Sequence, residues 1–127
     1  MLIEHIAIYA RDLERLRDFY EKYFGARVEP KYHNPKTGLQ AYFLNFDGGS
    51  RLELMTRPEL TASAKPQHQE GFIHIAFRVD SRDAVNALTE KMRGDGIKVV
   101  GEPRLTGTGG YESCLLDPEN NLVEITD

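Results

Sequence analysis

The sequence predicts an α+β fold in which two βαβββ modules form a curled mixed sheet with the helices on the outside. The main observation is a repeat: His5-Ile-Ala recurs as His74-Ile-Ala, 69 positions later (74 minus 5). Each copy lies in a short segment rich in β-branched and aromatic residues, which predicts a strand. An amphipathic stretch and further strand-like segments follow each copy. A repeat of this length indicates one structural unit written twice.

One helix is predicted in each half. In the first half Asp12 is a candidate N-cap and Gly25 a candidate C-terminal stop. In the second half Ser81 is the candidate cap, and Gly94 and Gly96 close the helix. The apolar residues at helical spacing are Leu13, Leu16, Tyr20, Tyr23 and Phe24 in the first helix and Ala84, Val85, Leu88 and Met92 in the second.

Strands are predicted at matching places in the two halves, separated by residues typical of turns. They cover residues 3–9, 26–29, 39–46 and 51–56 in the first half and 72–78, 97–100, 111–116 and 122–126 in the second.

The chain is expected to be a single domain over residues 1–127, with repeats at about 1–57 and 71–127 and a linker at 58–70. The linker contains Pro58 and Pro66 and shows no strong periodicity. Because each βαβββ unit is too small to be stable separately, we expect the two sheets to pair, within one chain or between two chains.

The composition excludes several classes of protein. Of the 127 residues, 40% are hydrophobic and 28% are charged, as in an ordinary globular domain. No apolar run approaches the roughly 20 residues that span a membrane, and the N-terminus lacks the pattern of a signal peptide. A cytoplasmic location without membrane contact is therefore expected. The net charge of -4, with no cluster of Lys and Arg, argues against nucleic acid and favours a small-molecule partner.

Several polar residues have simple structural interpretations. Cys114 is the single cysteine, so no intrachain disulfide is possible, and it is interpreted as a small apolar strand residue. His33 and His68 lie in predicted loops without a counterpart in the other half, and we do not expect them to bind metal. Residues 107–110 are interpreted as a flexible hairpin, because no helix follows to form a phosphate-binding loop.

Four other polar residues interrupt the apolar pattern of the strands at matching places. Successive side chains of a strand point to opposite faces. Glu53 and Glu124 each lie between two apolar neighbours, and His5 and His74 each precede an isoleucine, so all four point away from the apolar face. The separations from His to Glu nearly agree, at 48 (53 minus 5) and 50 (124 minus 74).

In a curled sheet with outer helices these four side chains would point into a common concavity. A carboxylate removed from water is costly unless it is paired or bound to metal. Two imidazoles and two carboxylates suit one divalent ion, with Ni, Co or Zn ranked before Fe or Mn, and leave room for water or substrate oxygens. We therefore expect His5, Glu53, His74 and Glu124 to bind one divalent metal ion.

These features resemble the vicinal oxygen chelate superfamily (glyoxalase/bleomycin resistance/dioxygenase), whose members are built from paired βαβββ modules. The resemblance covers essentially the whole chain. Its most specific segments are Ile3-Glu-His5-Ile-Ala-Ile, Asp18-Phe-Tyr20, Tyr23-Phe-Gly25, Leu52-Glu-Leu54, Ile73-His-Ile75 and Asp117-Pro-Glu-Asn-Asn-Leu-Val-Glu124-Ile.

The ligand set is similar to that of glyoxalase I, whereas epimerases of the superfamily usually carry Gln at the position of Glu53. The resemblance implies a metal-dependent lyase or isomerase that acts on a 2-oxoaldehyde thiol adduct, or a related small substrate, through an enediolate. A ligand carboxylate would move the proton, with Glu124 as the first choice of base and Glu53 as the second. A homodimer is expected at this length, and the ligands would come from one chain or from two.

Two positions depart from the glutathione-dependent enzymes of the family. Those enzymes commonly place an Arg four residues after the first His and an Asn four residues after the first-half Glu to hold the thiol. Here the positions are Tyr9 and Arg57. Both are candidate substrate-binding residues, since Arg57 can take a carboxylate as a bidentate fork. A different thiol, or a substrate without a thiol adduct, therefore stays open.

Two alternatives to a glyoxalase-like enzyme share the fold. One is a thiol transferase or another antibiotic-resistance protein, for which the sequence shows no clear phosphonate pocket. The other is a metal-free module that binds small molecules. The presence of all four candidate ligands argues against the second alternative.

Overall fold

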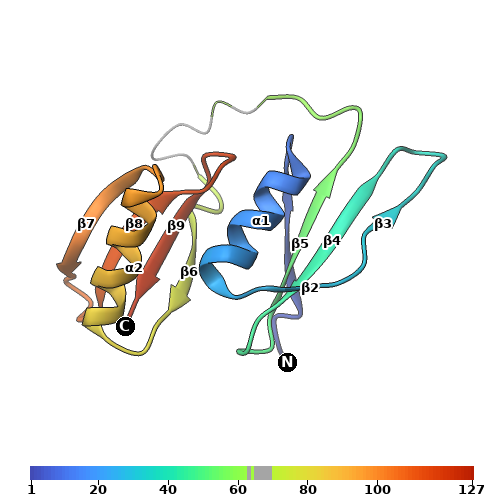
Figure 1. Cartoon of the computed structure of the whole chain (residues 1–127). Helices are drawn as coiled ribbons and strands as arrows, with labels where there is room; N and C mark the ends of the chain where they lie inside the picture. Colours follow the sequence, from blue (N-terminus) through green and yellow to red (C-terminus); the bar gives the residue numbers. More distant parts are fainter. Residues whose placement is uncertain (63, 65–69) are drawn as a thin grey trace. The chain divides into compact units, whose positions relative to one another are not determined.

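The computed structural model describes residues 1–62, 64 and 70–127. The chain divides into two compact units, residues 1–63 and residues 64–127, and each is described by itself. Each unit holds one helix against a mixed β-sheet, as Figure 1 shows. The predicted α+β fold class is confirmed. Among the described residues no helix is long and apolar enough to cross a membrane.

The first unit has a mixed sheet with strand order β1-β5-β4-β2, and β3 also pairs with β4. The β1–β5 pair is parallel and the pairs made by β4 are antiparallel. The elements are β1 (His5–Tyr9), α1 (Leu13–Phe24), β2 (Arg27–Val28), β3 (Tyr32–His33), β4 (Gln40–Asn45) and β5 (Arg51–Thr56).

The second unit repeats this plan with a four-stranded sheet in the order β6-β9-β8-β7. The β6–β9 pair is parallel, like β1–β5, and the other pairs are antiparallel. The elements are β6 (His74–Arg78), α2 (Arg82–Gly94), β7 (Val99–Leu105), β8 (Tyr111–Leu116) and β9 (Leu122–Thr126).

The predicted N-caps of both helices and the C-terminal stop of α1 are confirmed, whereas α2 has Asp95 as its C-cap, between the predicted Gly94 and Gly96. The Asp12 carboxylate accepts a hydrogen bond from the Arg15 amide at 3.0 Å, and the Ser81 hydroxyl accepts one from the Ala84 amide at 3.2 Å. These bonds satisfy backbone donors that a helix leaves free in its first turn. Helix α1 ends at Gly25, whose φ of +64° is a left-handed conformation that favours glycine.

The strand bounds differ from the prediction in several places. β2 and β4 are each one residue shorter at both ends than predicted. β1 and β6 begin at their histidines, two residues later than expected. The short strand β3 was not expected, and it contains His33, which had been assigned to a loop. The strand predicted at 97–100 instead runs from Val99 to Leu105 and includes Pro103. A proline is tolerated there because β7 is an edge strand with irregular register.

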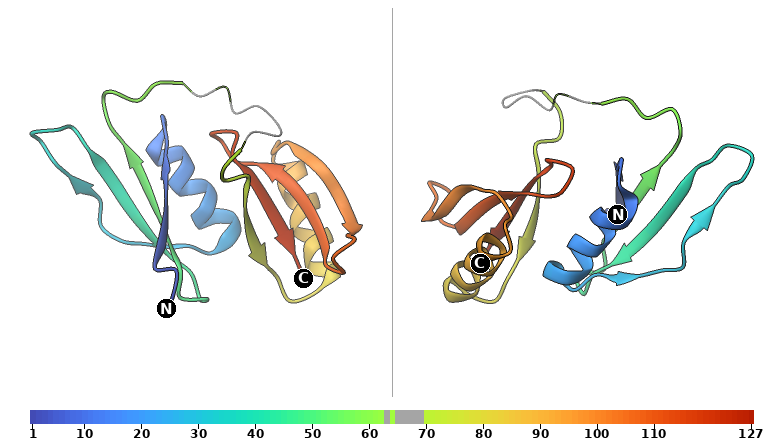
Figure 2. Two further views of the ribbon diagram at one scale, coloured as in Figure 1. Left: turned by 180° about the vertical axis from the view of Figure 1, so that it is seen from behind. Right: turned by 45° about the horizontal axis from the view of Figure 1, so that its top comes forward.

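Each helix covers one face of the sheet in its own unit, which the two further views in Figure 2 also show. In the first unit Leu16 and Tyr20 of α1 are fully buried, as are Leu44 and Leu54 of the sheet. In the second unit the fully buried residues are Val85, Thr89, Met92, Ser113, Leu115, Val123 and Ile125. Ala84 and Leu88, expected on the buried face of α2, are only half-buried.

A pair of hydroxyl groups lies inside the apolar contact between α2 and β8. The Thr89 hydroxyl donates to the Val85 carbonyl at 2.7 Å, one turn earlier in the helix. The Thr89 and Ser113 oxygens are also 2.7 Å apart, and both residues are fully buried. Because the Thr89 proton is used by Val85, Ser113 donates to Thr89. The pair is satisfied without water.

We predict unequal effects when this pair is broken. Thr89→Val leaves the Ser113 hydroxyl buried without its acceptor and should lower the free energy of unfolding by roughly 1 to 3 kcal/mol. Ser113→Ala leaves Thr89 bonded to Val85 and should cost less. The double variant should cost less than the sum of the two single variants, as measured by urea denaturation. Additive effects would contradict the hydrogen bond itself, and a larger loss in Ser113→Ala than in Thr89→Val would contradict its assigned direction.

Candidate functional site

In the first unit, His5 and Glu53 come from the adjacent parallel strands β1 and β5. Leu52 and Leu54 are buried beneath α1, and the alternation of the strand turns Glu53 to the opposite face of the sheet. His5 Nε2 lies 3.7 Å from Glu53 Oε2. The structure therefore brings together the two predicted ligands of this half.

The second unit repeats the arrangement with His74 and Glu124, from the adjacent parallel strands β6 and β9. Val123 and Ile125 are fully buried, so Glu124 again points to the face away from the helix. His74 Nε2 lies 3.8 Å from Glu124 Oε2. In both units the carboxylate is the more buried member of the pair.

Within each unit, the distance between the imidazole nitrogen and the carboxylate oxygen fits the binding of both atoms to one divalent ion. Nitrogen and oxygen ligands lie about 2.0 to 2.2 Å from Zn²⁺, so two atoms bound to one ion are at most about 4.3 Å apart. Separations of 3.7 and 3.8 Å meet this limit. They are too long for direct hydrogen bonds. An imidazole and a carboxylate at this spacing can each ligate the same ion.

The first pair is bordered by the ion pair of Glu4 and Arg51 and by an aromatic ring. Glu4 contacts His5 Nδ1 and also the guanidinium of Arg51. The hydrogen bond with His5 is the main cause that lowers the pKa of Glu4, and Arg51 adds to it. The Phe43 and His5 rings are perpendicular, with centroids 5.6 Å apart. Phe43 also pairs with Glu53 across the β4–β5 ladder.

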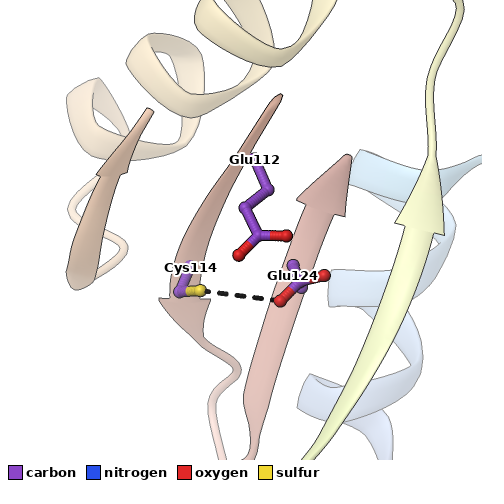
Figure 3. A group of neighbouring side chains, drawn as sticks. All are labelled: Glu112, Cys114 and Glu124. Carbon is purple, nitrogen blue, oxygen red and sulfur yellow. Dashed lines mark hydrogen bonds between the residues drawn. The ribbon is translucent and has the colours of Figure 1, made fainter. Parts of the chain in front are cut away.

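The surroundings of the second pair contain two more potential ligands, Glu112 and Cys114. Figure 3 shows both beside Glu124, with Cys114 Sγ 4.0 Å from a Glu124 oxygen. Ligand atoms of the three side chains lie within 4.8 Å of one another. Burial raises the pKa of Glu124, the positive charge of a protonated His74 opposes this effect, and Glu112 adds to it. Burial also raises the pKa of the Cys114 thiol.

Sequence reasoning missed the part of Glu112 and Cys114 in this group. They alternate with the buried residues Ser113 and Leu115 along β8, which puts them on the face that carries Glu124. The same alternation argument, applied to β8, would have found them. The expectation that Cys114 is a strand residue agrees with its place in β8, although its neighbours are carboxylates.

Arg104 brings a positive charge to this group. Its Nη2 lies 3.4 Å from Glu112 Oε1, and it also forms a hydrogen bond with Cys114. A side chain at Gly101 would place its Cβ 3.4 Å from Arg104 Nη1 and 3.2 Å from the Cys114 Cβ. The glycine therefore leaves room for the guanidinium. A positive charge at this place could meet an anionic group of a substrate.

The two candidate substrate-binding residues, Tyr9 and Arg57, interact with each other. Arg57 Nε donates to Glu59 Oε2 at 2.9 Å, and hydrogen bonds with Glu59 and then Tyr9 raise the pKa of Arg57. Their role toward a substrate stays a prediction. His33 is exposed in β3, and His68 lies outside the described residues.

Comparisons with known proteins agree with the repeated fold. The family model of the glyoxalase/bleomycin resistance protein/dioxygenase superfamily matches residues 2–125. The uncharacterized protein YwkD of Bacillus subtilis is 31% identical over 126 residues, covering 97% of this chain and 94% of that protein. The mitochondrial methylmalonyl-CoA epimerase of Bos taurus is 25% identical over 122 residues, covering 93% of this chain and 67% of the epimerase.

A solved structure extends the likeness to three dimensions. The trypanothione-dependent glyoxalase I of Leishmania major superposes with a TM-score of 0.80 at 25% identity, covering all of this chain and 86% of that one. The matched residues of the family model, 2–125, include every helix of both units and all strands but the last residue of β9. The chain therefore belongs to the glyoxalase/bleomycin resistance protein/dioxygenase superfamily, the vicinal oxygen chelate proteins.

Proposed function

We propose that this protein is a metal-dependent lyase or isomerase of the glyoxalase I type. Its substrate is a 2-oxoaldehyde thiol adduct or a related small molecule with a proton on the carbon beside a carbonyl group. One observation carries the proposal: each unit sets an imidazole and a carboxylate 3.7 or 3.8 Å apart at matching strand positions. The likeness to glyoxalase I of Leishmania major supports the choice of chemistry.

The proposed ligand set joins both pairs, His5 with Glu53 and His74 with Glu124, around one divalent ion. The donor types suit Ni, Co or Zn before Fe or Mn. When bound, the ion would supply the positive charge that acidifies the substrate C–H and stabilises an enediolate. We further propose that the protein is a homodimer. The two pairs of one site then come either from the same chain or from the two copies.

Within this site the protein itself has to move a proton. A ligand carboxylate can take the proton from one carbon of the substrate and return it to the neighbouring carbon. Glu124 is our first choice and Glu53 the second. The two carboxylates differ in their neighbours. Cys114 and Glu112 lie beside Glu124, whereas Phe43 lies opposite Glu53 in the β4–β5 ladder. The carboxylate of Glu112 offers Glu124 a second oxygen group through which a proton could pass.

A second candidate function is epimerisation of an acyl thioester. The similarity to methylmalonyl-CoA epimerase over 122 residues favours it. Both reactions begin with removal of a proton beside a carbonyl group, so the same carboxylates would serve. The two functions differ in where the proton returns, which a product assay distinguishes.

Metal content tests the ligand set. We predict one ion per chain after purification with Ni²⁺, Co²⁺ or Zn²⁺, measured by elemental analysis. His5→Ala, Glu53→Ala, His74→Ala and Glu124→Ala should each weaken binding by at least about tenfold, since loss of even an outer partner of a ligand has an effect of this size. Glu102→Ala, which removes a carboxylate from an exposed ion pair with Arg93, should keep the ion.

Other outcomes of this experiment would contradict the shared ion. Two ions per chain, falling to one in each variant, would show that each pair binds its own metal. Equal losses in Glu112→Ala and Glu124→Ala would place Glu112 among the ligands. If two chains contribute ligands to one ion, mixing equal amounts of the double variants H5A/E53A and H74A/E124A should restore about a quarter of the sites after full subunit exchange. Half of the dimers are then mixed, and each mixed dimer holds one intact site of two. No recovery would show that each chain supplies all four.

Turnover tests the reaction. We predict that the metal-loaded protein converts methylglyoxal with at least one of several thiols into a thioester, followed by the absorbance of the product. Glu124→Gln should lower kcat by about 10² to 10⁴, the usual contribution of a general base, when rates are divided by bound metal. Glu53→Gln should have a smaller effect.

The same samples separate the alternatives. Methylmalonyl-CoA should be tested in D₂O, where epimerisation places deuterium on the α-carbon, as seen by mass spectrometry. Epimerisation without conversion of methylglyoxal would favour the second candidate. Bound metal with neither turnover nor exchange would remove the enzyme assignment and leave a binding protein.

A further inference from the structure

The first-unit histidine has a carboxylate on each ring nitrogen, and the two contacts are of different kinds. Glu4 makes a hydrogen bond with His5 Nδ1. Glu53 lies 3.7 Å from Nε2, which is beyond the range of a hydrogen bond. A neutral imidazole carries its proton on the nitrogen that donates a hydrogen bond. The proton of His5 therefore belongs on Nδ1, and the Nε2 lone pair faces Glu53.

Glu4 is itself held in place. Its other oxygen contacts the Arg51 guanidinium, and Arg51 also lies 3.4 Å from a Glu29 oxygen. The Arg51 guanidinium lies over the Phe43 ring, 4.2 Å from the centroid, and the same ring is perpendicular to the His5 imidazole. The imidazole is thus restrained by the carboxylate on one nitrogen and by the aromatic ring against its side.

The second unit lacks this arrangement at the corresponding places. The residue before His74 is Ile73, which is 60% exposed and has no acceptor on its side chain. Leu122 is paired with His74, where Arg51 is paired with His5. Among the residues that the structure describes, Glu124 is the carboxylate that lies near the His74 imidazole. Before any metal binds, the two histidines therefore differ in the side chains that contact their ring nitrogens.

We propose that Glu4 is a positioning residue: its carboxylate accepts a hydrogen bond from the protonated Nδ1 of His5 and so directs the Nε2 lone pair toward the ion shared with Glu53. This inference rests on the proposed metal site. Carboxylates that accept a hydrogen bond from a ligating histidine fix its tautomer and ring orientation, and they raise its strength as a ligand. Glu4 would do this for His5 alone, which makes the first pair the better organised of the two.

The tautomer of His5 tests the inference in metal-free protein. Long-range ¹H–¹⁵N NMR spectra distinguish a protonated Nδ1 from a protonated Nε2, and His74 is an internal reference in the same sample. We expect His5 to be protonated on Nδ1 in the unmodified protein. In Glu4→Ala it should shift toward the Nε2-protonated form that a free imidazole prefers in water. Glu4→Gln keeps an acceptor oxygen and should largely retain the original tautomer.

Glu29→Ala is the matched control, because it also removes a carboxylate partner of Arg51 but does not contact His5 in the structure. It should change neither the tautomer nor the affinity for metal. Glu4→Ala should weaken Zn²⁺ binding by about 10- to 100-fold in competition with a chelator. Thermal unfolding of each variant shows whether a loss of affinity reflects a loss of fold.

Two results would overturn the role of Glu4: a proton on Nε2 of His5 in the unmodified protein, or equal effects of Glu4→Ala and Glu29→Ala on the tautomer. A protein that binds no metal would refute the proposed function instead. The tautomer would still show whether Glu4 orients His5, because that measurement needs no ion. If Glu4→Ala changed the tautomer but kept the affinity for Zn²⁺, the proposed link between the His5 tautomer and metal binding would be overturned.

Discussion

The site depends on the two-residue period of strands β5 and β9, each of which has a helix on one face only. Burial of the residues on either side of Glu53 and Glu124 fixes the orientation of these strands, because a shift of one residue would put a carboxylate under the helix. The parallel neighbours β1 and β6 then bring a histidine beside each carboxylate. The packing of the core thus determines where the polar groups point.

The two units differ in the residues next to their matching His–Glu pairs. In the first unit the neighbours are Glu4, Arg51 and Phe43, which restrain the histidine. In the second unit they are Glu112 and Cys114, which surround the carboxylate. In the proposed site, the first unit would hold a metal ligand in a fixed orientation and the second would supply the carboxylate that exchanges a proton. Such a division of labour suits a site in which binding and catalysis share the same set of side chains.

The sequence allowed most of the fold to be predicted, because both helices have capping residues and because β5, β8 and β9 alternate regularly. The extension of β7 through Pro103 could not be predicted, since edge position alone makes a proline acceptable there. The two His–Glu pairs were predictable from the repeat. Contacts made outside regular strands were not: Glu4 precedes β1, and its partner Arg51 is 47 residues away in sequence.

Pro103 also affects how the second sheet can meet other chains. An edge strand with free amide and carbonyl groups can recruit a foreign strand and start aggregation. In β7 the proline removes one donor, and the shifts in register between Val99 and Arg104 break the regular spacing of the others. This edge is consequently a poor template for strand addition. Substituting the proline would restore one amide donor to this edge and should make it more prone to pair with a foreign strand, while the irregular register would still interrupt the ladder.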